Sequence, residues 1–344
     1  MRSFPFGHLI WILALSTVAH LAPVRADGQN SPPDTVKPPA AINLGSTSFY
    51  DGFGRTRPGA TLLEYFRWAH DTEVSDANGN ENPKFISPRI DSFPDLVQLI
   101  VATRWRPLGG VAGFSVLAPF VDLRSSVARD SPKRLSNNGL GLGDIIAGPI
   151  FQSKFFGAEG VAQPVSKPRA RLDPYFAYRL QVLVQVPSGS FDATKSLNQG
   201  SGYWAVAPYF AATYLPVRRL EVSTRLHYQY NLVTDKLSNP PPIPHLVYKN
   251  GQAGQLIYDN FTTSYKFTRK LYLGANAYGV YQLTPDKTNG IRVGGARETQ
   301  AYVGPGGGYN LGNADTLNLN AYLKLEAHNT ASGPSLQLLY IHRF

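Results

Sequence analysis

The sequence predicts an all-β fold: one antiparallel β-barrel of about twelve strands, within a range of ten to fourteen, that spans a membrane. Three observations predict it. Apolar and polar residues alternate through long segments, short connections alternate with long polar ones, and after residue 22 no apolar run reaches the ~18 residues of a membrane-spanning helix. The 344 residues include 18 Phe and 19 Tyr but no Cys. That absence excludes disulfides, thiolate metal sites and a cysteine nucleophile.

Residues 1–26 have the features of a secretory signal peptide. Arg2 precedes the apolar stretch 9–19, and Val24 and Ala26 are small or branched residues at the two positions that a signal peptidase recognises. Because the apolar stretch is short and is followed by His20, these features favour cleavage over a membrane anchor. Cleavage leaves 31 basic and 23 acidic residues, a formal charge of +8.

That positive charge has several uses in an exported protein. Export from the cytoplasm leaves no route to nucleic acid, so we expect no nucleic-acid partner. The charge suits contacts with lipopolysaccharide phosphates, contacts between loops, or a lumen that attracts anions. The sequence leaves these three uses open.

Residues 27–58 are rich in proline, with Ser-Pro-Pro-Asp at 31–34 and Lys-Pro-Pro-Ala at 37–40. Proline cannot pair in the interior of a sheet, because it lacks the backbone N–H. We therefore expect residues 27–58 to form a periplasmic tether or a short plug, and residues 59–344 to form the transmembrane barrel.

The first evidence for strands is strict alternation in residues 220–230. One face would carry Leu220, Val222, Thr224, Leu226, Tyr228 and Tyr230, and the other Glu221, Ser223, Arg225, His227 and Gln229. Residues 317–327 repeat the pattern, with Asn318, Asn320, Tyr322, Lys324 and Glu326 opposite the apolar set. Such alternation indicates strands with an apolar medium on one side and a polar medium on the other.

Strand and connection lengths favour a membrane barrel over a soluble sandwich, whose strands are typically ~5–6 residues long. We expect strands at 59–70, 95–105, 111–122, 140–153, 172–186, 202–215, 219–231, 254–267, 271–283, 297–311, 315–327 and 334–344. Connections 106–110, 216–218, 268–270 and 312–314 are tight, whereas 71–94, 123–139, 187–201 and 232–253 are long and polar. Short periplasmic turns and long extracellular loops are typical of outer-membrane barrels. The long connection 153–171 departs from this rule, which indicates either a miscounted strand or a periplasmic excursion.

The last predicted strand ends the chain on an aromatic residue. Counting back by twos from Phe344 gives His342, Tyr340, Leu338 and Leu336. Leu336, Leu338, Tyr340 and Phe344 resemble the signal that the bacterial barrel-assembly machinery recognises, and His342 departs from it. Together with the signal peptide and the loop asymmetry, this strand predicts the outer membrane of a Gram-negative bacterium, in contact with its lipid and lipopolysaccharide.

Several short segments resemble the meta-pathway phenol-degradation family of bacterial outer-membrane proteins. They are residues 141–149, 184–192, 204–214, 248–251, 273–282 and 303–305, rich in Gly, Pro and aromatic residues, and they follow one another in order along the chain. The resemblance implies a barrel for passive passage of small hydrophobic or aromatic compounds across the outer membrane. It implies no catalytic or binding residues.

Enzymatic and metal chemistry find little support in the sequence. Gly139–Asp144 has the wrong spacing for a dinucleotide loop, and a glycine-rich strand is the simpler interpretation. The histidines are scattered without metal-ligand spacing. We therefore expect no catalytic residues, no cofactor and no metal.

The polar faces of the predicted strands supply the candidate lumen. The residues we expect to line it are Glu221, Arg225, His227, Tyr272, Asn276, Tyr278, Tyr322, Lys324 and Glu326. Glu221, Arg225, Lys324 and Glu326 would form a charge ladder along the conduit, or would fill a closed lumen by pairing with each other. Tyr228, Tyr230 and Tyr340 suit the aromatic girdles at the membrane interfaces.

Three alternatives to the hydrophobic channel remain open. A general porin for polar solutes would have a constriction of opposed charges. A lipid hydrolase embedded in the membrane would need a nucleophile beside a histidine on its outer face. A structural or adhesive barrel would bind a partner through its long loops.

Overall fold

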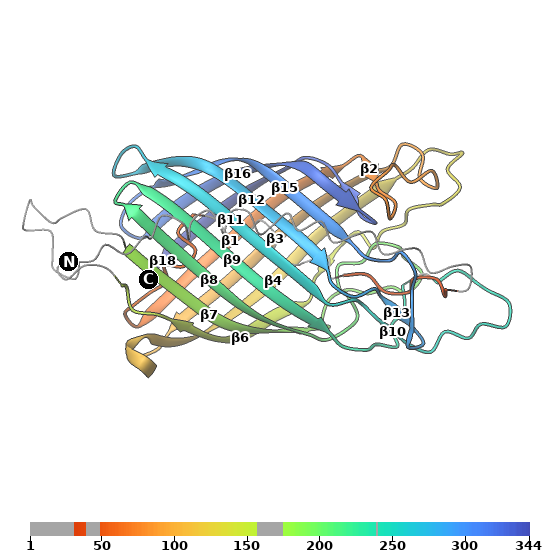
Figure 1. The fold of residues 1–344 in the computed structure, drawn as a ribbon, viewed down its shortest axis with the longest axis horizontal. Helices are drawn as coiled ribbons and strands as arrows, with labels where there is room; N and C mark the ends of the chain where they lie inside the picture. Colours follow the sequence, from red (N-terminus) through yellow and green to blue (C-terminus); the bar gives the residue numbers. More distant parts are fainter. Residues whose placement is uncertain (1–30, 39–48, 157–174, 239) are drawn as a thin grey trace, which may run out of the picture.

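The computed structural model describes residues 31–38, 49–156, 175–238 and 240–344. Within these ranges twelve antiparallel strands form one sheet, with β5 and β6 counted together as one strand. The sheet closes into a barrel because β3 pairs with β4 as well as with β1. Figure 1 shows a long barrel with tilted strands. The predicted barrel of about twelve strands is confirmed.

The barrel strands follow one another around the wall in chain order. They are β1 (Gly59–Asp71), β3 (Arg89–Ala102), β4 (Val111–Ser126), β5 (Leu140–Leu142) with β6 (Ile145–Gln152), β7 (Tyr175–Val186), β8 (Ala205–Val217), β9 (Leu220–Asn231), β11 (Leu256–Lys266), β12 (Leu271–Gln282), β15 (Thr299–Asn310), β16 (Asp315–His328) and β18 (Ser335–Arg343). Short pairs add β2 (Glu73–Val74) with β17 (Ala331–Ser332), and β10 (Gly251–Gln252), β13 (Lys287–Thr288) and β14 (Ile291–Arg292). A single turn of 3-10 helix spans Pro107–Gly109. No helix in the described ranges is long and apolar enough to cross a membrane.

Two strands differ most from the sequence prediction, the one expected at 95–105 and the one expected at 140–153. β3 begins at Arg89 instead of residue 95: the ladder to β1 has a gap at Pro94, which lacks an N–H, but the ladder to β4 continues through it. The strand expected at 140–153 is divided into β5 and β6 around Asp144. The carboxylate of Asp144 accepts hydrogen bonds from the backbone N–H of Gly189 (2.9 Å) and Ser201 (2.8 Å), which ties this break to the next loop.

The two ends of the barrel differ in their connections, as predicted. Connections 103–110, 218–219, 267–270 and 311–314 are short and lie at the end that holds the C-terminus (Figure 1). The other end carries the long connections, including 187–204 and the stretch from 232 to 255. By the construction rule of outer-membrane barrels the short-turn end is periplasmic and the long-loop end extracellular. The predicted signal peptide and residues 157–174 of the unusual connection lie outside the described residues.

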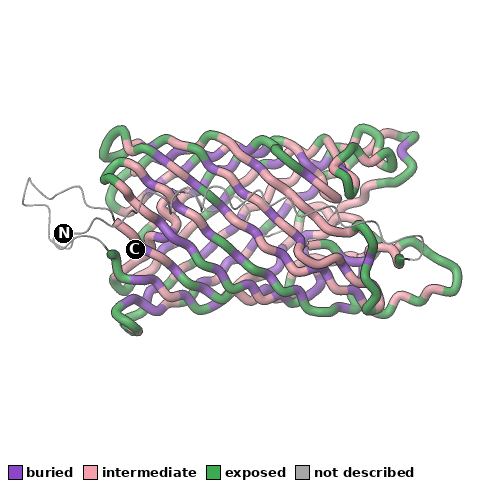
Figure 2. The backbone as a smooth tube through the Cα atoms, viewed as in Figure 1, coloured by how far each residue is buried: buried purple, intermediate pink, exposed green. Residues whose placement is uncertain are grey.

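Alternate residues of the strands turn large apolar side chains outward, and Figure 2 shows exposed and buried residues alternating along the wall. The outward set includes Phe66, Trp68, Leu99, Phe114, Phe120, Leu180, Val182, Phe210, Leu226, Tyr228, Tyr230, Phe261, Leu273, Leu319, Leu323, Leu336 and Leu338. An exposed apolar surface of this extent requires lipid around it.

Residues 33–37 lie among the long loops, although the sequence suggested a periplasmic position for this proline-rich part. The backbone N–H of Ser238 donates to the carbonyl of Thr35 (2.8 Å), and the Tyr203 hydroxyl donates to the carbonyl of Lys37 (2.6 Å). Val36 is buried with Tyr203, Leu237 and Ala253. In Figure 1 this segment is the red trace beside β10 and β13.

Candidate functional site

The inner wall of the barrel has an apolar side, which we call the apolar sector. Its centre is a buried cluster of Tyr65, Leu96, Leu117 and Leu339, against which Leu63, Ile146 and Ile341 pack. These residues come from β1, β3, β4, β6 and β18, five neighbouring strands that also carry apolar residues on the lipid face. Apolar side chains on both faces distinguish this part of the wall from a water-filled pore, whose interior is polar.

The opposite side of the inner wall, formed by β7, β8, β9 and β11, is polar. Its buried inward side chains include Arg179, Gln181, Gln185, Thr213, Glu221, Ser223, Arg225, His227, Gln229, Asn231, Asn260, Thr262 and Ser264. Many of them bond to one another: Ser223 and Thr213 share a hydrogen bond of 2.6 Å, and Ser264 donates to Glu221 at 2.8 Å. We call this side the polar sector.

Residues 49–58, which we call the inner segment, precede β1 and lie against the polar sector inside the barrel. The N–H of Gly52 donates to Thr213 Oγ1 (2.8 Å), its carbonyl accepts from Gln152 Nε2 (2.9 Å), and the N–H of Tyr50 donates to Glu221 Oε1 (3.0 Å). A Cβ atom at Gly52 would lie 2.3 Å from the backbone nitrogen of Thr213. Only glycine permits this approach of the segment to β8.

A buried ion pair fixes the inner segment on β9. Asp51 accepts from Arg225 Nε at 2.6 Å and from Arg225 Nη2 at 3.0 Å. Arg179 lies farther away, with its Nη1 atom 3.9 Å from Asp51 Oδ1. The guanidinium carbon of Arg225 also lies 5.3 Å from the centre of the Tyr209 ring. The two-point geometry with a carboxylate makes this a strong and directional contact.

Aromatic contacts hold the inner segment at its two sides. The rings of Phe49 and Tyr50 lie 5.5 and 5.3 Å from that of Tyr272 on β12. Phe53 lies 5.3 Å from Phe155 and 5.5 Å from Tyr175, at the start of β7. These pairs bring six aromatic rings together beside the segment.

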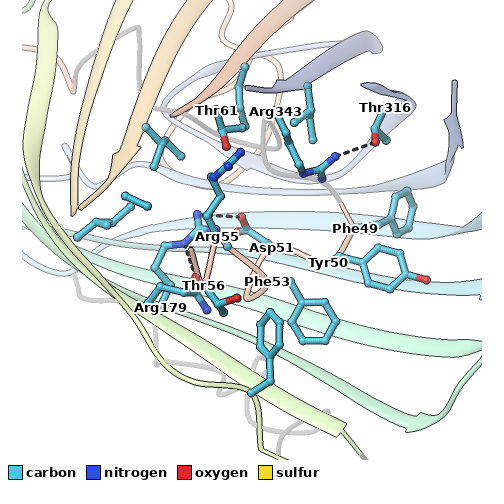
Figure 3. Close-up of a pocket in the computed structure, with 18 of the residues that line it drawn as sticks. Phe49, Tyr50, Asp51, Phe53, Arg55, Thr56, Thr61, Arg179, Thr316 and Arg343 are labelled. Carbon is cyan, nitrogen blue, oxygen red and sulfur yellow. Dashed lines mark hydrogen bonds and ion pairs between the residues drawn. The ribbon is translucent and has the colours of Figure 1, made fainter. Parts of the chain in front are cut away.

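A cavity of about 640 Å³ lies between the inner segment and the wall, at the short-turn end of the lumen. Its lining includes Phe49, Tyr50, Phe53, Leu63, Tyr65, Ile100, Ile150, Tyr272, Leu339 and Ile341, together with Asp51, Arg55, Arg57, Arg179, Arg218, Arg225, Lys266 and Arg343. Figure 3 shows the basic residues Arg55, Arg179 and Arg343 around one space with the aromatic residues of the inner segment. The cavity therefore has apolar, aromatic and cationic surfaces at once.

The structure places most of the candidate lumen residues at buried positions. Glu221 and Arg225 contact the inner segment, and the His227 ring lies between Tyr209 (4.6 Å) and Tyr258 (4.2 Å). The other buried candidates also contact neighbouring residues of the wall. Tyr272 donates to Asn318 Oδ1 at 2.5 Å, and Asn276 donates to the Pro305 carbonyl at 3.2 Å. Tyr278 and Tyr322 form a buried cluster with Tyr302.

Lys324 and Glu326 lie elsewhere, at the long-loop end of β16. Lys324 pairs with Glu73 of β2, and Glu326 pairs with His328 at 2.9 Å. The pairing of β15 with β16 shifts register at Ala301 and Tyr302, opposite this part of β16. The four charged residues expected in one ladder thus pair at separate places, Glu221 and Arg225 with the inner segment and the other two near the loops.

The sequence analysis missed the apolar sector and the basic residues of the cavity other than Arg225. A signal existed for the first, because residues 96–101, 116–121 and 336–341 carry apolar side chains at both odd and even positions. Such runs indicate strands that are buried on both faces. No sequence pattern links Arg55 or Arg343 to the others, since the closed barrel alone brings them together. Among the described residues, no group of three or more His, Asp or Glu could hold a metal ion.

Comparison with solved structures gives the fold a clear counterpart. A crystal structure of an outer membrane channel from Pseudomonas putida F1 superposes with a TM-score of 0.67 at 13% sequence identity, over 87% of this chain and 100% of that chain. Lower scores of 0.42 and 0.43, at 11% identity, relate it to the translocator domain of the autotransporter NalP from Neisseria meningitidis and to a deltaS2S3 mutant of the TodX monoaromatic hydrocarbon channel. The first covers 86% of this chain and 91% of that chain, and the second 93% and 96%. Scores at this lower level support no functional inference.

No curated protein matches the chain. The barrel, its lipid-facing surface and its structural counterpart locate the protein in the bacterial outer membrane. The model of the family described as "Putative MetA-pathway of phenol degradation" matches residues 73–340, which is most of the barrel. The chain belongs to that family.

Proposed function

We propose that the protein is a passive outer-membrane channel for small hydrophobic or aromatic compounds. The observation that carries the proposal is the apolar sector, which brings leucine, isoleucine and tyrosine side chains to the inner wall and borders the cavity. An aromatic compound that leaves water for such a wall gains about 25 cal/mol for each Å² of apolar surface that it buries. A polar solute gains nothing comparable there. The proposal includes no enzymatic step.

Family membership and the structural counterpart support this proposal. The family's description names phenol degradation, and the Pseudomonas putida protein is described as an outer membrane channel. A cavity of about 640 Å³ is large enough for a single-ring compound, since pockets for small molecules have volumes of ~300–1,000 Å³.

A general porin is the second candidate, because the polar sector would favour hydrated solutes. The two functions differ in which half of the wall the permeant contacts. Flux through liposomes separates them, with phenol as the aromatic probe and a sugar-sized charged molecule as the polar one. Phenol crosses lipid unaided, so the useful quantity is its flux in excess of empty liposomes.

Substitution of Leu63 and Ile100 tests the role of the apolar sector. Both residues line the cavity and both are only partly buried, so the double variant Leu63→Asn with Ile100→Asn leaves the wall's core cluster in place. We expect a several-fold loss of excess phenol flux with ion conductance retained. Leu63→Ile keeps the apolar surface and should behave as the parent. Unchanged phenol flux in the asparagine variant, or polar flux alone in the parent, would refute the proposal.

We also propose that Leu336, Leu338, Tyr340 and Phe344 form the assembly signal. Leu336 and Leu338 are exposed on the lipid face of β18, and Phe344 is 66% exposed. His342, which departs from the usual pattern, lies 2.7 Å from Asp315 through its Nδ1 atom, and the Tyr340 hydroxyl donates to the same carboxylate at 2.7 Å. The contact with Asp315 accounts for a histidine at position 342, so His342 needs no role in recognition by the assembly machinery.

A further inference from the structure

The cavity at the short-turn end carries an unbalanced positive charge. Among the described residues that line it, seven are arginine or lysine, and Asp51 is the single acidic residue. Asp51 is already engaged, since both of its oxygens accept from Arg225. Arg179 also lies near this carboxylate, with its Nη1 atom 3.9 Å from Asp51 Oδ1. The other five basic side chains have no carboxylate partner among the described residues that line the cavity.

Arg55 and Arg343 are two basic side chains of the cavity that retain hydrogen-bonding capacity for a ligand. Arg55 Nη1 donates to the carbonyl of Ala60 (3.1 Å), whereas its Nε atom is buried and has no hydrogen-bond partner in the described part of the chain. Arg343 Nη1 has one long contact, 3.3 Å to Thr316 Oγ1. Figure 3 shows both guanidinium groups beside the cavity.

The cavity also has a surface suited to a ring. Leu63 and Ile100 of the apolar sector lie on its wall together with Phe49 and Phe53 of the inner segment. A ligand that satisfies both surfaces has a flat apolar body and one anionic group. Guanidinium groups bind carboxylates through paired hydrogen bonds, and an aliphatic or aromatic wall excludes water from the ring.

We infer that this cavity is a binding site for small aromatic carboxylates, with the ring against the apolar sector and the carboxylate toward Arg55 and Arg343. The inference rests on the proposed channel function and narrows its substrate class. A carboxylic acid is ionised at neutral pH, as an Asp side chain is, whereas a phenolic hydroxyl with a pKa near ~10 remains neutral. The cavity therefore distinguishes benzoate from phenol by charge, and it retains the anion at the periplasmic end of the path.

Current blockade in planar lipid bilayers tests this inference with defined probes. Benzoate, benzyl alcohol and acetate would be titrated against the ion current of the full-length protein. Benzoate has the ring and the charge, benzyl alcohol has the ring alone, and acetate has the charge alone. We expect benzoate to block at about tenfold lower concentration than either of the others, as the loss of one charge-assisted or one apolar contact predicts.

A double variant in the cavity tests the site, and a single variant far from the cavity provides the control. Arg55→Gln with Arg343→Gln should weaken the benzoate block about tenfold and leave the benzyl alcohol block unchanged. Arg292→Gln removes a charge from β14, whose residues are exposed and lie among the extracellular loops, and should change neither. Far-ultraviolet circular dichroism and heat-dependent gel mobility would establish that each variant folds. The reversal potential in a potassium chloride gradient gives a second readout, which should show anion selectivity that the double variant loses.

The outcomes separate this inference from the channel proposal. Equal block by benzoate and benzyl alcohol, unaffected by the arginine substitutions, would overturn the carboxylate site and leave the hydrophobic channel standing. Equal block by benzoate and acetate would overturn the role of the apolar wall in the site. A parent protein that is cation-selective, or that benzoate does not block, would overturn the inference, and failure of phenol flux as well would overturn the channel.

Discussion

Asp51 and Arg225 lie 174 positions apart in the sequence, and their ion pair holds the inner segment on β9. Both side chains are largely buried, and removal of one partner leaves the other charge without compensation in a dry environment. Such a loss costs about 3–5 kcal/mol. At the scale of single residues, this pair is the strongest candidate for control of the path through the lumen.

Asp51→Asn should release the inner segment from β9. We expect a larger single-channel conductance, because the segment then no longer occupies the polar side of the lumen. Conductance in planar bilayers measures this directly. Asp122→Asn is the matched control, since Asp122 pairs with Arg124 on the exposed surface, where an ion pair contributes little. Parent-like conductance of Asp51→Asn would show that the pair does not hold the segment in the path.

Asp286 makes the docking of residues 33–37 depend on pH. Burial raises the pKa of this loop carboxyl well above its ordinary value of 3.8; the Asp34 carboxylate raises it further, and Lys37 opposes the increase. Thr288, two positions after Asp286, contacts the docked segment through its hydroxyl group. This hydroxyl shares a hydrogen bond of 3.0 Å with the Thr35 hydroxyl and donates to the Pro33 carbonyl at 2.8 Å. Because the folded state favours the protonated form, the docked segment is most stable below pH 3.8 and loses that contribution as the pH rises through the raised pKa.

A single cysteine reports this change, since the chain has none of its own. The Val36→Cys thiol, buried when residues 33–37 are docked, should react faster with a membrane-impermeant maleimide as the pH rises. Val247→Cys, at a loop position that is 69% exposed, corrects for the reagent's own pH dependence. Asp286→Asn should flatten the corrected profile. An identical profile with and without the carboxyl would contradict the assignment.

Strand by strand, the sequence predicted what depends on local pattern. β9 alternates strictly, so its lumen and lipid faces follow from the residue types alone, whereas the alternation of burial in β16 ends at Tyr322 and the next four residues are all exposed. β3 extends beyond its predicted start because pairing with β4 overrides the effect of Pro94. The apolar sector was harder to recognise, since strands with apolar side chains on both faces show no alternation. The position of the inner segment depends on contacts over more than a hundred residues, which no local pattern encodes.

β18 carries the prediction for barrel assembly. Phe344→Ser should reduce the amount of folded protein in the outer membrane by more than half, yet leave refolding in detergent unchanged, because Phe344 is exposed and adds little to stability. Heat-dependent gel mobility of membrane fractions gives the measurement. Phe267→Ser removes another exposed aromatic residue from the same end of the barrel and should have no effect. Equal losses in both variants would remove any special role for the terminal residue.

The whole molecule combines two kinds of wall in one closed sheet. The polar sector and the inner segment bind each other through hydrogen bonds and the Asp51–Arg225 pair. The apolar sector lines the cavity on the other side. Residues 33–37 are fixed at the extracellular end and residues 49–54 near the periplasmic end, so the N-terminal part of the chain contacts the barrel at both ends of its lumen. The candidate site is therefore a product of the closed barrel and not of any single element.

β18 has apolar side chains on its two faces, Leu336 and Leu338 toward lipid and Leu339 and Ile341 toward the lumen, and residues 335–341 carry no charge. Before insertion this strand has neither lipid nor β1 to cover it. A short uncharged segment of high β-propensity without proline is the type that forms intermolecular sheets. Until the barrel closes, this strand is therefore an aggregation hazard for the chain in the aqueous periplasm.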